Sequence, residues 1–406
     1  MTGNKTSVRS WAYQASVGAE GINAATDTTY LFGFKDQSQD WKVPSMKTDV
    51  EEHHVYGSRE PAGLTPLTPE YKPFITGFYP TTPQHLIWQL KQVVDAAPTH
   101  DVTVLDSGLP LPLTIRYEMN DGGVDRLFQA VDCYSIGLYW RAMYKDKFYV
   151  ENEWMYGRLE DRRGQWLFDD TCAARAANSI TLTDDADRTA NSLASHLCYI
   201  NGGDHENDEY NITANTDADP TVLTTTETTG ASLAADTLSV WDRVRPKLTT
   251  APVMPGYTAT NAYMGTPEVY WDVGDENVAL PECWKVECQH TQEYSTVPDT
   301  DDKYQITYLH KHNPIKLTLE IVCETHKDVY DYIDRKANDI NVKVYKPNTN
   351  YYLLHKLTGC EIIDREETGH ANKGHWNAKV FLKALAITGE FTLEAETNWS
   401  THYKAV

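Results

Sequence analysis

The chain of 406 residues lacks several features that usually point to a function. No apolar run approaches the length of a membrane-spanning helix, and the first ten residues are polar. We therefore expect neither a membrane segment nor a secretory signal. The 7 cysteines are odd in number and lack the spacing of a small disulfide framework. They are interpreted as reduced, mostly buried thiols.

Motifs that carry chemistry are also missing. The sequence has no GxGxxG or GxxxxGK phosphate loop and no GxSxG nucleophile turn. Its carboxylate pairs are adjacent, so in strands they diverge instead of converging on a substrate. The run from Asp204 to Glu209 is the best calcium candidate, but it lacks the glycine and terminal glutamate of an EF-hand loop. We expect no enzyme activity, no catalytic residues, no cofactor and no bound metal. A hydrolase with dispersed carboxylates is the remaining catalytic alternative.

Positive charge is scarce. The formal net charge is -22, which argues against a surface that clamps nucleic acid. It is compatible with a surface that DNA must pass without being held. Between Arg188 and Arg243 there is no Lys or Arg, and this stretch is rich in Thr, Ala and Asp. Residues 165–262 are therefore either a solvated insertion or a small, β-rich decoration domain.

A pattern that occurs twice is the most informative feature present. The tripeptide at Trp41 recurs at Trp284, an offset of 243 residues, and after one change of register Cys133 pairs with Cys360 at an offset of 227. The first copy has about 16 extra residues, interpreted as a loop over 98–112. A repeat this long indicates a duplicated domain. The equivalent pairs predicted to lie in the core are Trp41 and Trp284, Leu86 and Val329, Leu90 and Ile333, and Cys133 and Cys360.

Each copy follows the order strand, strand, helix, strand, hairpin. In the first copy Thr82 is the expected N-cap, Pro83 the first helical residue, and the helix continues to Val94. In the second copy a helix is expected to begin after Thr325. Long alternating strands surround both helices. The predicted fold is mainly β, with two similar antiparallel sandwich or barrel domains, each with one short helix, at 1–164 and 263–406, and an acidic, β-rich segment at 165–262 between them.

Several short elements occur in the same order as in one known family. They are an N-terminal arm with a strand through Trp11 to Glu20, the Tyr56-Gly57-Ser58-Arg59 element, the strand and helix from Phe74 to Val94, the Leu111-Pro112-Leu113-Thr114-Ile115 strand, and the turn at Cys133. In this organisation the chain resembles the major tail tube proteins of long, non-contractile tailed viruses of bacteria and archaea. The resemblance covers about 10–160 and 265–395 and leaves the middle unmatched.

The resemblance implies a structural function. Tail tube proteins join their sheets into a continuous β-barrel around a channel, and a chain that carries the fold twice forms the ring from three copies. The implied partners are the chain itself, other tail proteins and double-stranded DNA that passes without specific binding. The implied location is the virion tail, assembled in the host cytoplasm. The residues expected to face the channel are Glu151, Glu153, Glu361 and Asp364.

Two other classes of function remain open at the level of sequence. Exposed Trp and Tyr residues on a β-sandwich would suit a glycan or receptor-binding module, such as a viral adhesin. Another tail component, such as a hub, terminator or collar protein, would share the fold and its organisation.

Overall fold

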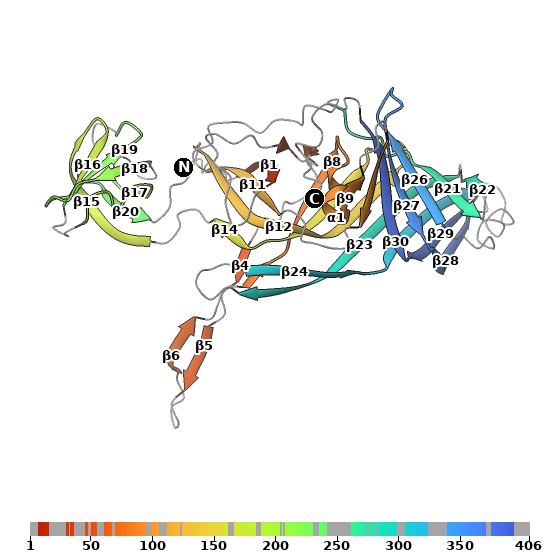
Figure 1. The fold of residues 1–406 in the computed structure, drawn as a ribbon, viewed down its shortest axis with the longest axis horizontal. Helices are drawn as coiled ribbons and strands as arrows, with labels where there is room; N and C mark the ends of the chain where they lie inside the picture. The colour runs from red at the N-terminus through yellow and green to blue at the C-terminus, as the bar shows by residue number, and fades with distance from the viewer. Residues whose placement is uncertain are drawn as a thin grey trace.

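The computed structural model describes residues 7–15, 30–31, 33–35, 45–47, 50–54, 61–66, 70–94, 99–104, 112–121, 124–160, 166–183, 188–203, 205, 208–229, 235–241, 261–273, 276–280, 282–298, 305–323, 339–370 and 375–393. In this part of the chain most residues lie in antiparallel strands, and a single helix is present (Figure 1). The predicted mainly-β fold is confirmed.

The first copy of the repeat forms two layers that share one 20-residue strand, β12 (Val124–Met143). One layer has the strand order β2-β1-β11-β12-β14 and includes the first half of β12. The other layer has the order β12-β13-β8-β3 and includes its second half. The change occurs near Asp132, whose φ of 54° is left-handed. We call these strands the first unit: β1 (Ser7–Ala15), β2 (Tyr30–Leu31), β3 (Gly33–Lys35), β8 (Phe74–Pro80), β11 (Leu113–Asp121), β12, β13 (Tyr149–Met155) and β14 (Arg158–Glu160).

The second copy repeats these pairings strand by strand. One layer has the order β22-β21-β26-β27-β30, and the other has the order β28-β29-β25-β23. In the first unit Phe78 lies opposite Val150, and in the second Ile321 lies opposite Ala378, so Phe78 and Ile321 keep the offset of 243. The second unit comprises β21 (Glu268–Val273), β22 (Glu276–Ala279), β23 (Cys283–Pro298), β25 (Ile315–Cys323), β26 (Asp339–Tyr345), β27 (Tyr352–Thr358), β28 (Glu361–His370), β29 (His375–Ala384) and β30 (Ala386–Thr392).

The helix of the first unit is shorter than predicted. Helix α1 (Gln84–Leu90) has Pro83 at its N-cap position with no side-chain cap, so Thr82 is not the cap. Lys91 has a left-handed φ of 75° and ends the helix, and the chain continues as β9 (Lys91–Val94). Nearly every residue of α1 is buried, including Gln84 and Gln89. The helix is thus enclosed on nearly all sides, and only Trp88 is half-buried. The helix expected after Thr325 lies outside the described residues.

Two sets of strand pairs join the units. The second half of β12 pairs with β23, so one eight-strand layer runs β3-β8-β13-β12-β23-β25-β29-β28 across both units. On the other side β10 (Thr99–Val104) pairs with β30 and adds the β9–β10 hairpin to the second unit's sheet. The extra residues of the first copy were predicted to be a loop. Residues 99–104 of this segment instead form a strand, β10, which joins the two units by pairing with β30.

Residues 166–241 contain a separate closed barrel, with the order β15-β16-β19-β18-β17-β20. Its core of Cys, Leu, Ile, Val and Tyr residues forms its own cluster, whereas buried residues of both repeat units form a single other cluster. The middle segment is therefore folded and β-rich, and lies at one end of the molecule (Figure 1). Its strands are β15 (Trp166–Ala176), β16 (Ser179–Leu182), β17 (Leu197–Gly202), β18 (Glu209–Asn215), β19 (Val222–Thr225) and β20 (Thr237–Trp241).

The remaining strands form hairpins that extend from the two units. The distal part of β23 pairs with β24 (Gln305–His312) in the second unit. In the first unit β4 (Ser45–Lys47) pairs with β7 (Glu70–Lys72), and β5 (Val50–His54) pairs with β6 (Pro61–Pro66). The β5–β6 hairpin projects away from the layers in Figure 1.

Candidate assembly surface

The eight-strand layer has one core face and one face that is open in the described structure. Directly opposed residues on neighbouring strands share a face. A continuous row of such residues runs from β8 to β28 and joins Glu151 to Glu361. It comprises Gly77, Glu151, Tyr139, Gln289, Lys316, Lys383 and Glu361.

The other two channel candidates lie on the same face. Glu153 is two residues along β13 from Glu151, and Asp364 lies opposite Phe381, two residues along β29 from Lys383. Because side chains alternate along a strand, these spacings keep all four carboxylates on the open face. Glu361 and Asp364 are exposed, and Glu151 and Glu153 are half-buried. The structure thus brings the four predicted residues onto one surface, although they come from two units.

This open face carries charges of both signs. Among the described residues of this face seven are acidic and five are basic. On β23 and β25 both signs occur along one strand, whereas β13 and β28 carry acidic residues and β29 carries lysines. Lys285 is 2.9 Å from Glu320 and 3.2 Å from Glu287, and the Tyr139 hydroxyl donates to Glu287 at 2.9 Å. The acidic residues are Glu151, Glu153, Glu287, Glu320, Glu361, Asp364 and Glu366, and the basic ones are Arg141, Lys285, Lys316, Lys379 and Lys383.

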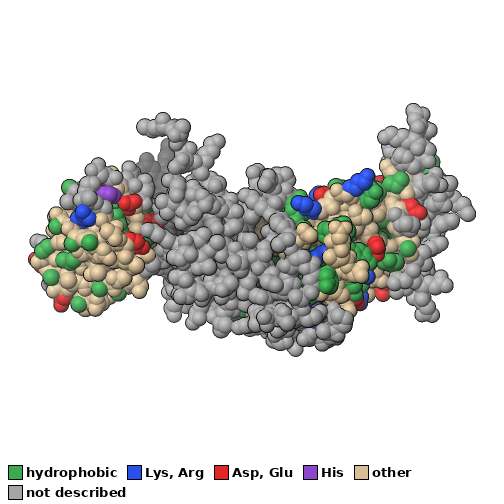
Figure 2. All heavy atoms as spheres, turned by 90° about the horizontal axis from the view of Figure 1, so that it is seen from above, with side chains coloured by type: hydrophobic (Ala, Val, Ile, Leu, Met, Phe, Trp, Pro, Cys, Tyr) green, Lys and Arg blue, Asp and Glu red, His purple; other side chains and the backbone are tan. Residues whose placement is uncertain are grey.

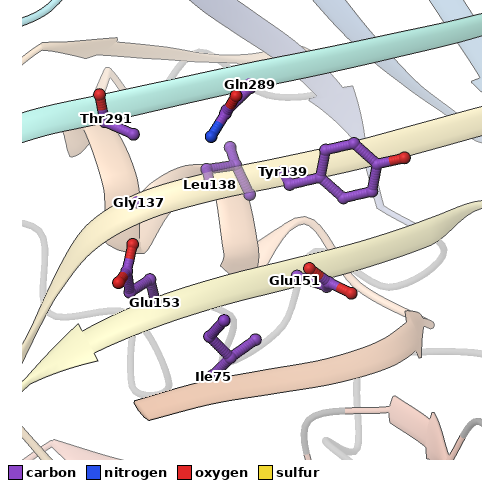
Figure 3. Close-up of a pocket in the computed structure, with 8 residues that line it drawn as sticks. All are labelled: Ile75, Gly137, Leu138, Tyr139, Glu151, Glu153, Gln289 and Thr291. Atoms are coloured by element: carbon purple, nitrogen blue, oxygen red, sulfur yellow. The ribbon is translucent and has the colours of Figure 1, made fainter. Parts of the chain in front are cut away.

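A small hollow interrupts the face at Gly137 (Figure 3). A side-chain carbon at Gly137 would lie 2.9 Å from a carboxylate oxygen of Glu153, so the missing side chain leaves room for that carboxylate. The hollow has a volume of about 90 Å³, whereas ligand pockets usually measure roughly 300–1,000 Å³. It is too small for an organic substrate. Its lining residues are Ile75, Gly137, Leu138, Tyr139, Glu151, Glu153, Gln289 and Thr291.

The β12–β23 seam between the units contains a buried polar network. The Lys91 ammonium donates to the Gln89 carbonyl at 3.0 Å and to Gln292 Oε1 at 2.7 Å. Burial lowers the pKa of Lys91 to about 7. Nearby, His290 Nε2 lies 3.0 Å from His312 Nδ1. Burial, followed by the proximity of His312 and Lys91, lowers the pKa of His290 to about 3. The seam therefore favours neutral groups.

The β10–β30 seam is closed by tight apolar packing. Leu86 of α1 lies directly on Gly389 of β30, where a side-chain carbon would be 2.0 Å from Leu86 Cδ2. His355 of β27 lies between the units, with its ring centroid 4.4 Å from that of Trp140 and 6.0 Å from that of His85. Burial lowers the pKa of His355 to about 3. Close packing of this kind holds the two units together as one body.

The repeat-equivalent core candidates fall into three groups. Leu86, Leu90, Cys133 and Cys360 are buried. Cys133 and Cys360 also share a local geometry, because each thiol donates to the carbonyl three residues earlier, at 3.2 Å and 3.5 Å. Trp284, predicted to lie in the core, is only half-buried, because it is the extra residue of a β-bulge between β23 and β25. Trp41, Val329 and Ile333 lie outside the described residues.

Several residues that build the seams were not predicted to do so. Gln89 and Lys91 fall within the helix that was predicted to continue to Val94, and they contribute to the polar network of the seam. His290 and Gln292 carried no motif. Along β23 the buried positions alternate, and His290 and Gln292 continue the series begun by Val286 and Cys288. A polar residue in such a series is the signal that could have marked a buried partner.

A metal site and a membrane-spanning helix are both absent from the described part of the chain. No group of three or more His, Cys, Asp or Glu side chains there is placed to hold a metal. No helix among those residues is long and apolar enough to cross a membrane. No protein-family model matches the chain, and the comparison with curated proteins gives no significant match. The strand edges and the open face are the features of the described residues that bear on function.

Proposed function

We propose that this chain is a structural virion protein that assembles into rings, and that stacked rings form a tail tube through which viral DNA is delivered. The supporting observation is the β12–β23 seam. In the first unit β12 pairs with β13 as β28 pairs with β29 in the second, and β3 pairs with β8 as β23 pairs with β25. One chain therefore already contains one contact between neighbouring repeats.

The two ends of the eight-strand layer are the counterparts of that seam. Among the described strands, β28 pairs only with β29, and β3 pairs only with β8. β28 has ten residues, and an unpaired edge of that length favours pairing with another chain, whereas the described part of β3 has three. A head-to-tail contact between β28 of one copy and the β3 side of the next repeats the internal seam, and such contacts form closed rings when the rotation closes. Three copies per ring follow from the resemblance to tail tube proteins with a duplicated domain.

The open face suits passage of DNA. Stable binding of duplex DNA requires Lys and Arg contacts that release counterions. Here the seven carboxylates outnumber the five basic residues, and the adjacent Lys316 and Lys383 are followed by Glu361, so phosphates meet no long basic track. The barrel of residues 166–241 would project outward, since a channel occupied by DNA has no room for it. One barrel face shows scattered acidic side chains instead of a continuous charged patch (Figure 2).

In this proposal the chain has no enzymatic role. Its partners are other copies of itself and the neighbouring tail proteins, and it contacts DNA only transiently. Its location is the virion tail, after assembly in the host cytoplasm.

Electron microscopy of the purified protein tests the proposal directly. We expect stacked rings or tubes with three chains per ring and a channel wide enough for duplex DNA. Single rings that never stack would indicate a hub or terminator instead. Monomers at high protein concentration would overturn the proposal and favour a binding module such as an adhesin. Six chains per ring would refute the trimer and leave the tube function intact.

A further inference from the structure

Two isoleucines mark the same irregularity in the two units. Ile136 is the extra residue of a β-bulge between β12 and β13, and Ile363 is the extra residue of a β-bulge between β28 and β29. They are separated by the repeat offset of 227 that also relates Cys133 to Cys360. A bulge at the same place in both units is a repeated structural feature, because bulges change the direction of a strand at a defined point.

The two bulges differ in what surrounds them. Ile136 is 3% exposed, whereas Ile363 is 54% exposed. Next to Ile136, β12 pairs with β23 of the second unit from Gly137 onward. Next to Ile363, β28 has no partner on that side among the described strands. The same side chain is thus buried where a neighbouring repeat follows along the layer and exposed where none follows.

We propose that β28 docks onto the β3 side of the first unit of a second copy of this chain, and that this contact buries Ile363 as the internal seam buries Ile136. This inference rests on the proposed ring assembly and specifies its chain-to-chain contact. The occupant is a second copy because the molecule itself shows what covers this edge. The strand that covers β12 is β23, and its counterpart in the first unit is β3, at the opposite end of the layer.

The geometry makes the contact directional. The β28 edge belongs to the second unit and the β3 edge to the first, so each copy offers one edge of each kind. The row that ends at Glu361 then continues into the first unit of the next copy, and the open faces of successive copies form one surface. An exposed isoleucine on an edge strand would otherwise favour unspecific aggregation.

Site-specific photo-crosslinking tests the contact. A benzophenone amino acid is placed at position 363, and labelled (nitrogen-15) and unlabelled chains are assembled together before illumination. We expect crosslinked peptides of mixed isotope that join position 363 to the first unit, in the region of β3 and β8. Rings that form and give crosslinks only to the second unit, or only within one chain, would overturn this inference while the tube function stands. A protein that stays monomeric by microscopy would overturn both.

A charge at the bulge gives an independent test. Ile363→Lys should raise the protein concentration required for ring formation at least tenfold. Its circular dichroism spectrum and melting temperature should be unchanged, because the side chain is exposed in a single copy. Tyr144→Lys is the matched control, since Tyr144 is also 54% exposed but lies in the turn between β12 and β13. It should form rings like the parent. Normal ring formation by Ile363→Lys would contradict the proposed burial.

Discussion

Glu151 and Glu361 lie in one cross-strand row, on the same face of the same layer, although they belong to different units. The row passes through the seam between Tyr139 of β12 and Gln289 of β23. Each unit supplies part of this face, and the face is continuous only because the two units are joined. Any molecule that moves along this face meets both repeats.

The contact between Leu86 and Gly389 should control the stability of the joined units. Gly389→Ala adds a carbon 2.0 Å from Leu86 Cδ2, and overpacking of a core costs roughly 1–3 kcal/mol. Leu86→Ala alone should cost roughly 2–5 kcal/mol, because Leu86 is fully buried. The double variant should lose less than the sum, since the smaller side chain makes room for the new methyl group. Urea unfolding of all four proteins measures the coupling, and strict additivity would contradict the assigned contact.

Acid should weaken the protein through its buried histidines. Burial lowers the pKa of His290 to about 3, from an ordinary value of 6.5. Between these values the unfolded chain binds the proton and the folded chain does not, so the free energy of unfolding falls as the pH falls from 6.5 toward 3. Each such group contributes at most about 1.4 kcal/mol per pH unit.

His290→Gln isolates this contribution. Glutamine can replace the hydrogen bond to His312 and does not titrate. Urea unfolding at pH 7 and pH 4.5 should show a smaller loss of stability for the variant than for the parent. A residual loss is expected, because burial also lowers the pKa of His312 to about 4 and that of His355 to about 3. Equal losses in parent and variant would show that His290 is protonated in the folded protein.

The barrel should be dispensable for assembly. Its strands run from Trp166 to Trp241 and pack around their own core, so the seams between the units do not depend on it. A flexible linker in place of residues 166–241 should leave ring formation and the melting temperature of the repeat units unchanged. A cut inside β15, for example at Thr171, would leave half a strand behind. A soluble, folded deletion variant that never forms rings would make the barrel an assembly element.

The sequence predicted the features that depend on local pattern. Strand alternation and the offset of 227 between Cys133 and Cys360 were enough to find the repeat and its strands. The end of α1 was missed because Lys91 is left-handed, a conformation that only the surrounding contacts favour. The β10–β30 pairing and the exposure of Ile363 could not be predicted, because both depend on how distant strands associate. Periodicity shows which residues share a face, and it does not show which edge stays open.

Reversal of charge on the open face should convert a surface that DNA passes into one that holds it. Parent tubes should retain no duplex DNA at physiological salt, since the carboxylates outnumber the lysines on this face. The double variant Glu151→Lys, Glu361→Lys places two new cations in the row that already contains Lys316 and Lys383. Its tubes should retain DNA. For each phosphate contact, the logarithm of the binding constant should fall by roughly 0.9 for every tenfold rise in salt concentration.

A matched control separates position from net charge. Asp169→Lys, Asp217→Lys changes the net charge by the same amount on exposed sites of the barrel. If the open face lines the channel, only the variant on that face should retain DNA inside tubes and protect it from nuclease. The barrel variant can bind DNA only on its outer surface, where nuclease reaches it. Protection by both variants, or by neither, would mean that the row from Glu151 to Glu361 does not face the channel, because a charge acts on passing DNA only within about 10 Å at 0.1 M salt.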